Sequence, residues 1–140
     1  MGDNNELANV QNAALTSSIL SKNGIDTSLP FSRDIFLMNT MINGAMHVKT
    51  IYKQAKALKK GDRLKLLLEP KNKYDEKAIL VLDPKGKKLG YIPRVKNEVL
   101  YHLMDAGKEL FGIVHGGDIG DHLDERDSWI EIYIDVYMCD

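Results

Sequence analysis

The most regular pattern of apolar and polar residues lies at the end of the chain, over residues 129–138. Apolar side chains take every second position there, and polar or aromatic side chains take the positions between them. A period of two residues is typical of a strand that buries one face, so this segment predicts a closing strand. Its buried face comprises Ile130, Ile132, Ile134, Val136 and Met138.

Five further segments predict strands. The first covers residues 34–46, with Asn43-Gly44 as a bend or bulge within it. Asp83-Pro84-Lys85-Gly86 is rich in turn residues, so the apolar segments on either side of it form a hairpin. The remaining four strands are predicted over residues 63–69, 77–82, 88–92 and 109–115.

Helical spacing appears in three places. Residues 95–106 have an apolar stripe at helical spacing, and Gly107 ends it. Residues 51–58 predict a short helix within a basic segment. Residues 5–22 predict an N-terminal helix, followed by a linker over 25–33. The stripe of the helix over 95–106 consists of Val95, Val99, Leu100, Leu103 and Met104.

Together these elements predict a mainly β fold of the α+β class. Six short strands with Gly/Pro turns favour a small barrel or sandwich, with one helix inserted before the last two strands. The predicted organisation is an N-terminal helical extension and linker over residues 1–30 and one domain over residues 31–140. A chain of 140 residues is most simply one domain.

Composition and charge narrow the class of protein. No apolar run is long enough to span a membrane, no signal peptide is evident, and the single Cys139 fits a reducing cytoplasm. Net charge is −1, but residues 49–88 hold thirteen Lys/Arg against five Asp/Glu. This layout is compatible with a basic binding face or with a solvated lysine-rich loop.

The residues that carry chemistry lie mainly between Glu69 and Asn97. Tyr74 and Asp75 occupy a polar loop, Tyr91 follows Gly90 on a strand, and Arg94 follows Pro93. Two aromatic rings and a carboxylate at one hairpin mouth suit a nucleotide end better than any common catalytic scheme. From the residues alone, Asp75 could equally satisfy turn N–H groups and Tyr74 could fill the barrel edge.

Signatures of catalysis are missing. The chain has no P-loop, no G-x-S-x-G and no Cys–His arrangement in a supporting context. The acidic, glycine-rich loop over residues 115–124 has the spacing of neither an EF-hand nor a zinc site. We therefore expect no enzyme activity, no metal and no cofactor. A metal-dependent nuclease using the acids of residues 118–124 is the least favoured alternative.

An ordered set of motifs resembles the HIRAN domain family. The pattern E-P-x-N-x-Y-D-x-x-A-I at residues 69–79, followed by K-L-G-Y-I-P-R at residues 88–94, is similar to its core signature. L-x-x-G-D-x-L at residues 58–64 and L-M-D-A-G-K at residues 103–108 match as well. The resemblance covers roughly residues 31–140 and implies an OB-like six-stranded barrel.

The resemblance also implies roles for individual residues. Tyr74 would stack on a terminal base, and Asp75 would accept a hydrogen bond from the 3′-hydroxyl of a DNA strand. Tyr91 would lie near the base or sugar, and Arg94 would pair with a phosphate. Asn97 is a weaker candidate, as a helix cap or a phosphate donor.

The chain departs from the family pattern at two places. Met46-His47 stands where nucleic-acid-binding relatives carry a basic residue followed by aromatics, although His47 can still stack or donate. Lys73 replaces the expected proline before Tyr74 and adds a positive charge beside the proposed pocket. The first departure bears directly on how tightly a strand end would bind.

The sequence therefore predicts a nucleic-acid-binding module that recognises single-stranded DNA at a 3′ end. The resemblance implies a context of DNA repair, replication restart or mobile-element handling, with a helicase or other repair protein as a possible partner. The alternative is a protein-interaction module with a silenced DNA pocket, in which the last strand leaves an edge free and Tyr133 and Tyr137 lie in the interface. The sequence leaves the oligomeric state open.

Overall fold

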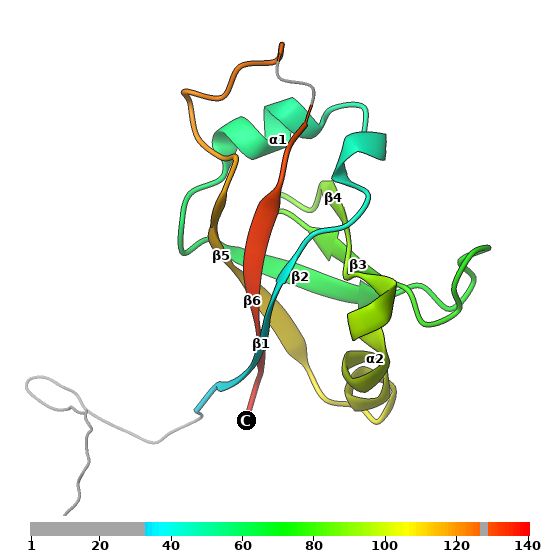
Figure 1. The fold of residues 1–140 in the computed structure, drawn as a ribbon. Helices are drawn as coiled ribbons and strands as arrows, with labels where there is room; N and C mark the ends of the chain where they lie inside the picture. Colours follow the sequence, from blue (N-terminus) through cyan, green and yellow to red (C-terminus); the bar gives the residue numbers. More distant parts are fainter. Residues whose placement is uncertain (1–32, 127–128) are drawn as a thin grey trace, which may run out of the picture. The chain divides into compact units, whose positions relative to one another are not determined.

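Six strands form one antiparallel sheet with the order β1-β6-β5-β2-β3-β4 (Figure 1). The computed structural model describes residues 33–126 and 129–140. The strands are β1 (Ile35–Met41), β2 (Arg63–Leu68), β3 (Ile79–Leu82), β4 (Lys88–Tyr91), β5 (Leu110–Gly117) and β6 (Ile132–Met138). The strand count and the α+β class predicted from the sequence are confirmed for this part of the chain.

Two short α-helices accompany the sheet. Helix α1 (Ile51–Ala57) precedes β2, and α2 (Asn97–Asp105) connects β4 to β5. A 3₁₀ turn precedes each of them: η1 (Ala45–His47) and η2 (Arg94–Lys96). None of the helices among the described residues is long and apolar enough to cross a membrane.

The sheet curls into a half-barrel whose two edge strands approach each other at one point. The backbone N–H of Asn43 donates to the carbonyl of Tyr91 at 2.7 Å, and the N–H of Tyr91 donates back at 2.8 Å. Gly90 permits this approach, because it has a φ of 151° and a Cβ at that position would collide with the Asn43 carbonyl. The bridge places the segment after β1 directly beside Tyr91.

The core follows the alternation expected from the sequence. Ile132, Ile134 and Val136 of β6 are fully buried, as are Ile79 and Val81 of β3. They pack in one cluster with side chains from the two helices, among them Ile51, Ala55 and Leu100. Burying one such aliphatic side chain stabilises a fold by about 1.5–3 kcal/mol, so this cluster is the main support for the loops at its rim.

Two predicted elements end earlier or begin later than the pattern indicated. The strand predicted over residues 34–46 ends at Met41, because Gly44 takes a left-handed φ of 75° and the chain turns into η1. The helix predicted over residues 95–106 begins at Asn97. Its predicted apolar stripe is wrong at Val95 and Val99, which are 91% and 63% exposed. Val95 lies in η2, whose three residues per turn displace its side chain from the face that a continuous α-helix would bury, whereas Val99 lies within α2 on its exposed side.

The helix predicted over residues 5–22 lies outside the described residues. The same is true of most of the predicted linker over residues 25–33. The division of the chain at residues 30 and 31 therefore stays a prediction.

Candidate functional site

The loop between β2 and β3 is held in shape by one asparagine. The side-chain oxygen of Asn72 accepts hydrogen bonds from the backbone N–H groups of Tyr74 at 2.9 Å and Asp75 at 3.1 Å. Its amide nitrogen donates to Glu69 Oε1 at 3.0 Å. Side-chain-to-backbone bonds of this kind fix a turn locally. The loop therefore presents Tyr74 and Asp75 in a defined orientation.

The Asp75 carboxylate is the best-anchored group of the loop. Oδ1 accepts the backbone N–H of Lys77 at 2.9 Å, and Oδ2 accepts the Asn97 side-chain amide at 2.8 Å. Arg94 Nε lies 3.9 Å from Oδ2. The hydrogen bond from the Lys77 N–H, followed by that from Asn97, lowers the pKa of Asp75 below its usual range. The carboxylate is thus kept ionised.

Asp75 still has acceptor capacity. An ionised carboxylate offers about four lone-pair sites, and the two bonds from Lys77 and Asn97 use two of them. The side chain is 18% exposed, so the unused sites can be reached from solvent. A hydroxyl is a suitable donor for them, whereas a phosphate would be repelled by the charge.

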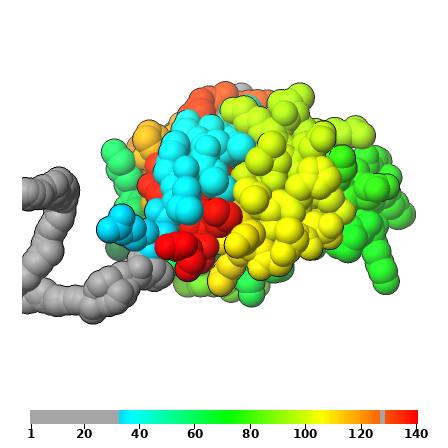
Figure 2. Space-filling view, turned by 90° about the horizontal axis from the view of Figure 1, so that it is seen from below, coloured from blue at the N-terminus to red at the C-terminus, as the bar shows by residue number. Residues whose placement is uncertain are grey.

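Asn97 is placed beneath Asp75 and not at the surface. Only 3% of Asn97 is exposed, and its amide also donates to the Lys77 carbonyl at 3.0 Å. As the first residue of α2, it ties that helix to the loop before β3. Figure 2 shows the two segments as neighbours, α2 in yellow and the loop in green at the margin of this face. Asn97 therefore positions the carboxylate.

Tyr74 points away from the body of the domain. It is 85% exposed, while its backbone N–H is held by Asn72. Lys73 beside it is exposed as well. A fixed backbone with a free aromatic ring is a suitable arrangement for stacking on a flat ligand.

Tyr91 is linked to the same loop through Glu69. Its hydroxyl donates to Glu69 Oε1 at 2.8 Å, the same atom that accepts the Asn72 amide. Lys88 Nζ lies 4.7 Å from the centre of the Tyr91 ring, within the range of a cation–π contact. A bulge at β4 brings Lys88 and Tyr91, three residues apart, to the same face of the strand.

His47 lies across the Asn43–Tyr91 bridge in a hollow of about 420 Å³. Trp129 lines the same hollow and is 60% exposed. Sequence patterns do not single out Trp129, which only begins the predicted closing strand. The signal in the sequence that could have identified it is a large aromatic residue directly after a polar loop. Met46 lines the same hollow and is partly buried against the core, where its sulfur accepts the Ile130 backbone N–H at 3.3 Å.

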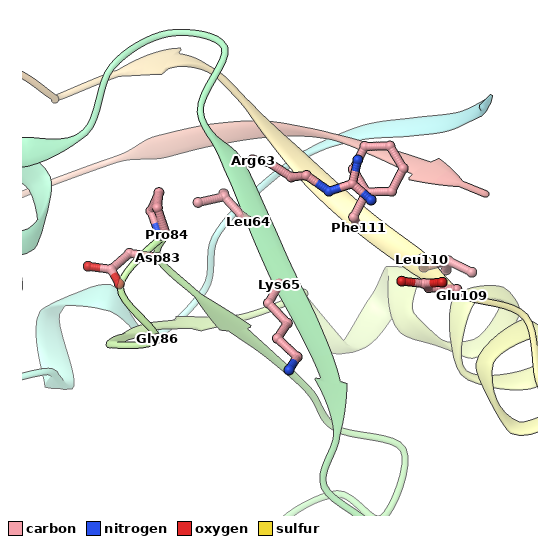
Figure 3. Close-up of a pocket in the computed structure, with 9 residues that line it drawn as sticks. All are labelled: Arg63, Leu64, Lys65, Asp83, Pro84, Gly86, Glu109, Leu110 and Phe111. Atoms are coloured by element: carbon pink, nitrogen blue, oxygen red, sulfur yellow. The ribbon is translucent and has the colours of Figure 1, made fainter. Parts of the chain in front are cut away.

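A larger hollow of about 500 Å³ lies elsewhere and contains none of the predicted site residues (Figure 3). The guanidinium carbon of Arg63 lies 3.6 Å from the centre of the Phe111 ring and covers it. Phe111 in turn stacks on Tyr137, which meets Phe36 edge to face. This row of side chains extends across β2, β5, β6 and β1.

The idea that the last strand leaves an edge free is wrong. β6 pairs with β1 on one side and with β5 on the other. The alternation of its side chains shows a buried face but carries no information on how many neighbours a strand has. Tyr133 is engaged within the domain, because its hydroxyl donates to Glu131 at 2.8 Å.

The acids after β5 do not gather into a cation site within the described part of the chain. Residues 33–126 and 129–140 contain no group of three or more His, Cys, Asp or Glu side chains arranged to hold a metal ion. Asp118 accepts the backbone N–H of Glu131 at 2.8 Å, and Asp124 pairs with Arg126 at 2.7 Å. These carboxylates serve the loop itself.

Comparison with known proteins agrees with this fold. The sequence model of the HIRAN domain family matches residues 39–137. A crystal structure of a protein from Lactobacillus plantarum is 28% identical, with a TM-score of 0.67, and the match covers 79% of this chain and 99% of that one. The crystal structure of the HIRAN domain of human HLTF has the same fold at 16% identity and a TM-score of 0.57, covering 76% and 78%. An NMR structure of that human domain gives a TM-score of 0.51 at the same identity.

The comparison with curated proteins returned no match. The family model nevertheless spans well over half of the chain, and the bacterial structure is matched over almost its whole length. The chain belongs to the HIRAN domain family.

Proposed function

We propose that this HIRAN domain binds single-stranded DNA and recognises a free 3′-hydroxyl end. The observation that carries the proposal is the Asp75 carboxylate, ionised and anchored at a solvent-facing loop beside the exposed Tyr74 ring. HIRAN domains are in general non-catalytic binding modules, and the proposal requires no catalytic group.

Asp75 supplies the selectivity for an end. Its two unused acceptor sites fit the terminal hydroxyl, and a hydrogen bond to a charged acceptor is worth about 1.5–3 kcal/mol. An internal linkage or a 3′-phosphate would bring a negative charge to the same place. The difference corresponds to a preference of roughly 10- to 100-fold for a hydroxyl end.

Aromatic rings supply the affinity for bases. Tyr74 takes the terminal base, and Tyr91 lies near its sugar. Across the Asn43–Tyr91 bridge, Trp129 and His47 line a hollow that accommodates a further base. Each stacked base contributes about 1–3 kcal/mol and is accepted whatever its identity, so binding is largely independent of sequence. Stacking on the widely exposed Tyr74 and Trp129 rings would supply affinity that does not depend on the family's basic residue at the position of Met46.

Cations around the loop supply contacts to phosphates. Arg94 is 75% exposed, so its guanidinium can reach a phosphate although it lies 3.9 Å from Asp75. Lys73 is exposed beside Tyr74, and Lys88 lies over the Tyr91 ring. Because these contacts are electrostatic, binding weakens as salt is raised. The resemblance to the HIRAN family, and not the geometry of the site, adds to the proposal a role in DNA repair or replication alongside a helicase or other repair protein.

Fluorescence anisotropy with two short strands tests the proposal. The strands share a sequence and differ only in a 3′-hydroxyl or a 3′-phosphate. The wild-type protein should prefer the hydroxyl, and Asp75→Asn should lose most of that preference, because it removes the charge and keeps the shape. Asp135→Asn is the matched control, since the Asp135 carboxylate is also held by an asparagine amide, that of Asn39, at 2.9 Å but on another part of the sheet.

Equal binding of the two ends by the wild type would contradict end recognition. If Asp75→Asn and Asp135→Asn lose the preference for the hydroxyl end to the same extent, the effect is not specific to the loop that holds Asp75. Thermal melting of all three proteins separates a loss of binding from a loss of fold.

A second candidate function is protein binding through the outer face of β1. Phe36 is 54% exposed and sits at the end of the row formed with Tyr137 and Phe111. Exposed aromatic side chains are enriched where proteins associate. Association that survives Asp75→Asn and high salt, and is lost in Phe36→Ser, would favour this function.

A further inference from the structure

A basic groove lies between α1 and the turn that joins β3 to β4. It encloses about 320 Å³ and is lined by Lys53 and Ala57 on one side and by Asp83, Lys85 and Lys87 on the other. None of these residues belongs to the site around Asp75. We refer to this hollow as the α1 groove.

The turn side of the α1 groove is fixed by a buried carboxylate. Asp83 is 7% exposed, and its Oδ1 accepts the backbone N–H groups of Lys85 at 2.9 Å and Lys87 at 2.7 Å. The Gly86 N–H donates to the Asp83 carbonyl at 2.9 Å. Both lysines therefore leave a rigid turn, and the negative charge among them is already bound to the backbone.

The helix side of the α1 groove is fixed as well. The amide nitrogen of Gln54 donates to the Lys88 carbonyl at 3.0 Å, which ties α1 to β4. Ile51 and Ala55 anchor the same helix in the core. The distance between Lys53 and the turn is thus set by the fold.

The α1 groove is positively charged. Its three lysines face one acid, and Asp83 is engaged with backbone N–H groups. The ion pairs found within the described residues involve other cations, such as Lys56 with Glu125 and Lys77 with Glu98. Three ammonium groups that pair with no acidic side chain of residues 33–126 and 129–140 favour a polyanion over a neutral or basic ligand.

The α1 groove and the site around Tyr91 are joined by one short segment of the chain. Lys88 follows Lys87 directly, and the β4 bulge turns its ammonium group over the Tyr91 ring at 4.7 Å. From Lys87 to Tyr91 the chain spans at most about 13 Å, because an extended residue rises about 3.3 Å and the β4 bulge shortens the segment. Lys85, Lys87 and Lys88 are thus spaced along the chain between the groove and the Tyr91 ring, over a length that matches a few nucleotides.

We propose that the α1 groove holds the phosphates of the strand whose 3′ end occupies the Asp75 loop, with the strand following β4 past Lys88. This inference rests on the proposed function and extends its footprint to Lys53, Lys85 and Lys87. It predicts that longer strands gain affinity through charge alone.

Anisotropy with strands of two lengths, about 4 and about 12 nucleotides with a 3′-hydroxyl, tests the inference in the whole chain. The groove variant is Lys53→Ala/Lys85→Ala/Lys87→Ala. The control variant is Lys59→Ala/Lys60→Ala/Lys108→Ala, which removes the same charge from exposed lysines elsewhere.

The groove variant should bind the short strand like the control variant and the long strand at least about tenfold more weakly at low salt. Each phosphate contact of a single strand contributes about −0.7 to the slope of log affinity against log salt, so losing three contacts makes the slope shallower by about 2. Between about 50 and 200 mM salt, this corresponds to a roughly 20-fold smaller fall in affinity.

The other outcomes separate this inference from the proposed function. If end binding depends on Asp75 but the groove and control variants behave alike at both lengths, the groove inference is overturned alone. Length-dependent binding that needs the groove lysines but ignores the 3′ end supports the groove and overturns end recognition. No binding of either strand by the wild type overturns both.

Discussion

The Asn97→Ala variant probes how the proposed site is built. Asn97 is almost fully buried and uses one amide group twice, for the Asp75 carboxylate at 2.8 Å and for the Lys77 carbonyl at 3.0 Å. Alanine removes both bonds and leaves no replacement partner. We expect a loss of stability and, through Asp75, a loss of end binding.

The magnitude follows from the two bonds. The bond to the ionised carboxylate is worth about 1.5–3 kcal/mol and the bond to the carbonyl about 0.5–1.5 kcal/mol. The free energy of unfolding should therefore fall by about 2–4 kcal/mol. Loss of the Asn97 bond also raises the pKa of Asp75 toward its usual range. Affinity for a 3′-hydroxyl strand should fall by about tenfold, since a misplaced carboxylate forfeits about 1.4 kcal/mol.

Asn39→Ala is the matched control. Asn39 also donates to a carboxylate, Asp135, and to a backbone carbonyl, that of Ile134, but Asn39 itself is exposed whereas Asn97 is buried. Because water can hydrogen-bond to the groups that an exposed side chain leaves behind, the free energy of unfolding of Asn39→Ala should fall by less than about 1 kcal/mol relative to the wild type. Strand binding should not change.

Urea denaturation and anisotropy measure the two effects. A double-mutant cycle with Asp75→Ala isolates the contact between Asp75 and Asn97, for which we expect a coupling energy of about 1–3 kcal/mol. A coupling energy near zero, or a fall in unfolding free energy below about 0.5 kcal/mol, would refute the reasoning.

Three further predictions concern single features. Tyr74→Ala should weaken strand binding by about 1–3 kcal/mol, while the free energy of unfolding measured in urea stays within about 0.5 kcal/mol of the wild-type value. A large loss of stability would show that the ring is structural. Gly90→Ala should lower the melting temperature by several degrees, because a Cβ collides with the Asn43 carbonyl at positive φ; an unchanged melting curve would contradict the observed bridge. The lowered pKa of Asp75 predicts that the carboxylate stabilises the fold fully above its unfolded-state pKa of about 3.9, and that this contribution is lost as pH falls from there through the lower folded-state pKa. The difference in unfolding free energy between wild type and Asp75→Asn should therefore change with pH in this acidic range, and a difference that stays constant there would contradict the two anchoring bonds.

Much of the fold was predictable because strands and helices repeat apolar residues at characteristic spacings along the sequence. The alternation at Ile132, Ile134 and Val136 identifies the buried face of β6 without any knowledge of its neighbours. Periodicity says nothing about pairing, so the sequence did not reveal that β6 lies between β1 and β5. A periodic pattern also assumes one uniform helix. The chain instead forms a 3₁₀ turn before α2, and Val95, predicted as a core residue, is exposed there.

For the candidate site, the sequence predicts a set of residues and not how they are arranged. Motifs identified Tyr74 and Asp75, whereas the buried position of Asn97 follows only from a contact between residues 22 positions apart. Trp129 was missed because its hollow forms from the segment after β1 and the segment before β6, which are distant in sequence. Such contacts are set by tertiary packing, which local patterns do not encode.

The most direct test of end recognition is a nitrogen–proton NMR titration with a short 3′-hydroxyl strand. The account predicts the largest shifts at the backbone amides of Tyr74, Asp75 and Lys77, since the Lys77 N–H is hydrogen-bonded to the carboxylate that would receive the terminal hydroxyl. A matching strand with a 3′-phosphate should give much smaller shifts at the same amides. Shifts confined to Phe36 and its neighbours on the outer face, or identical shifts with both strands, would contradict the account.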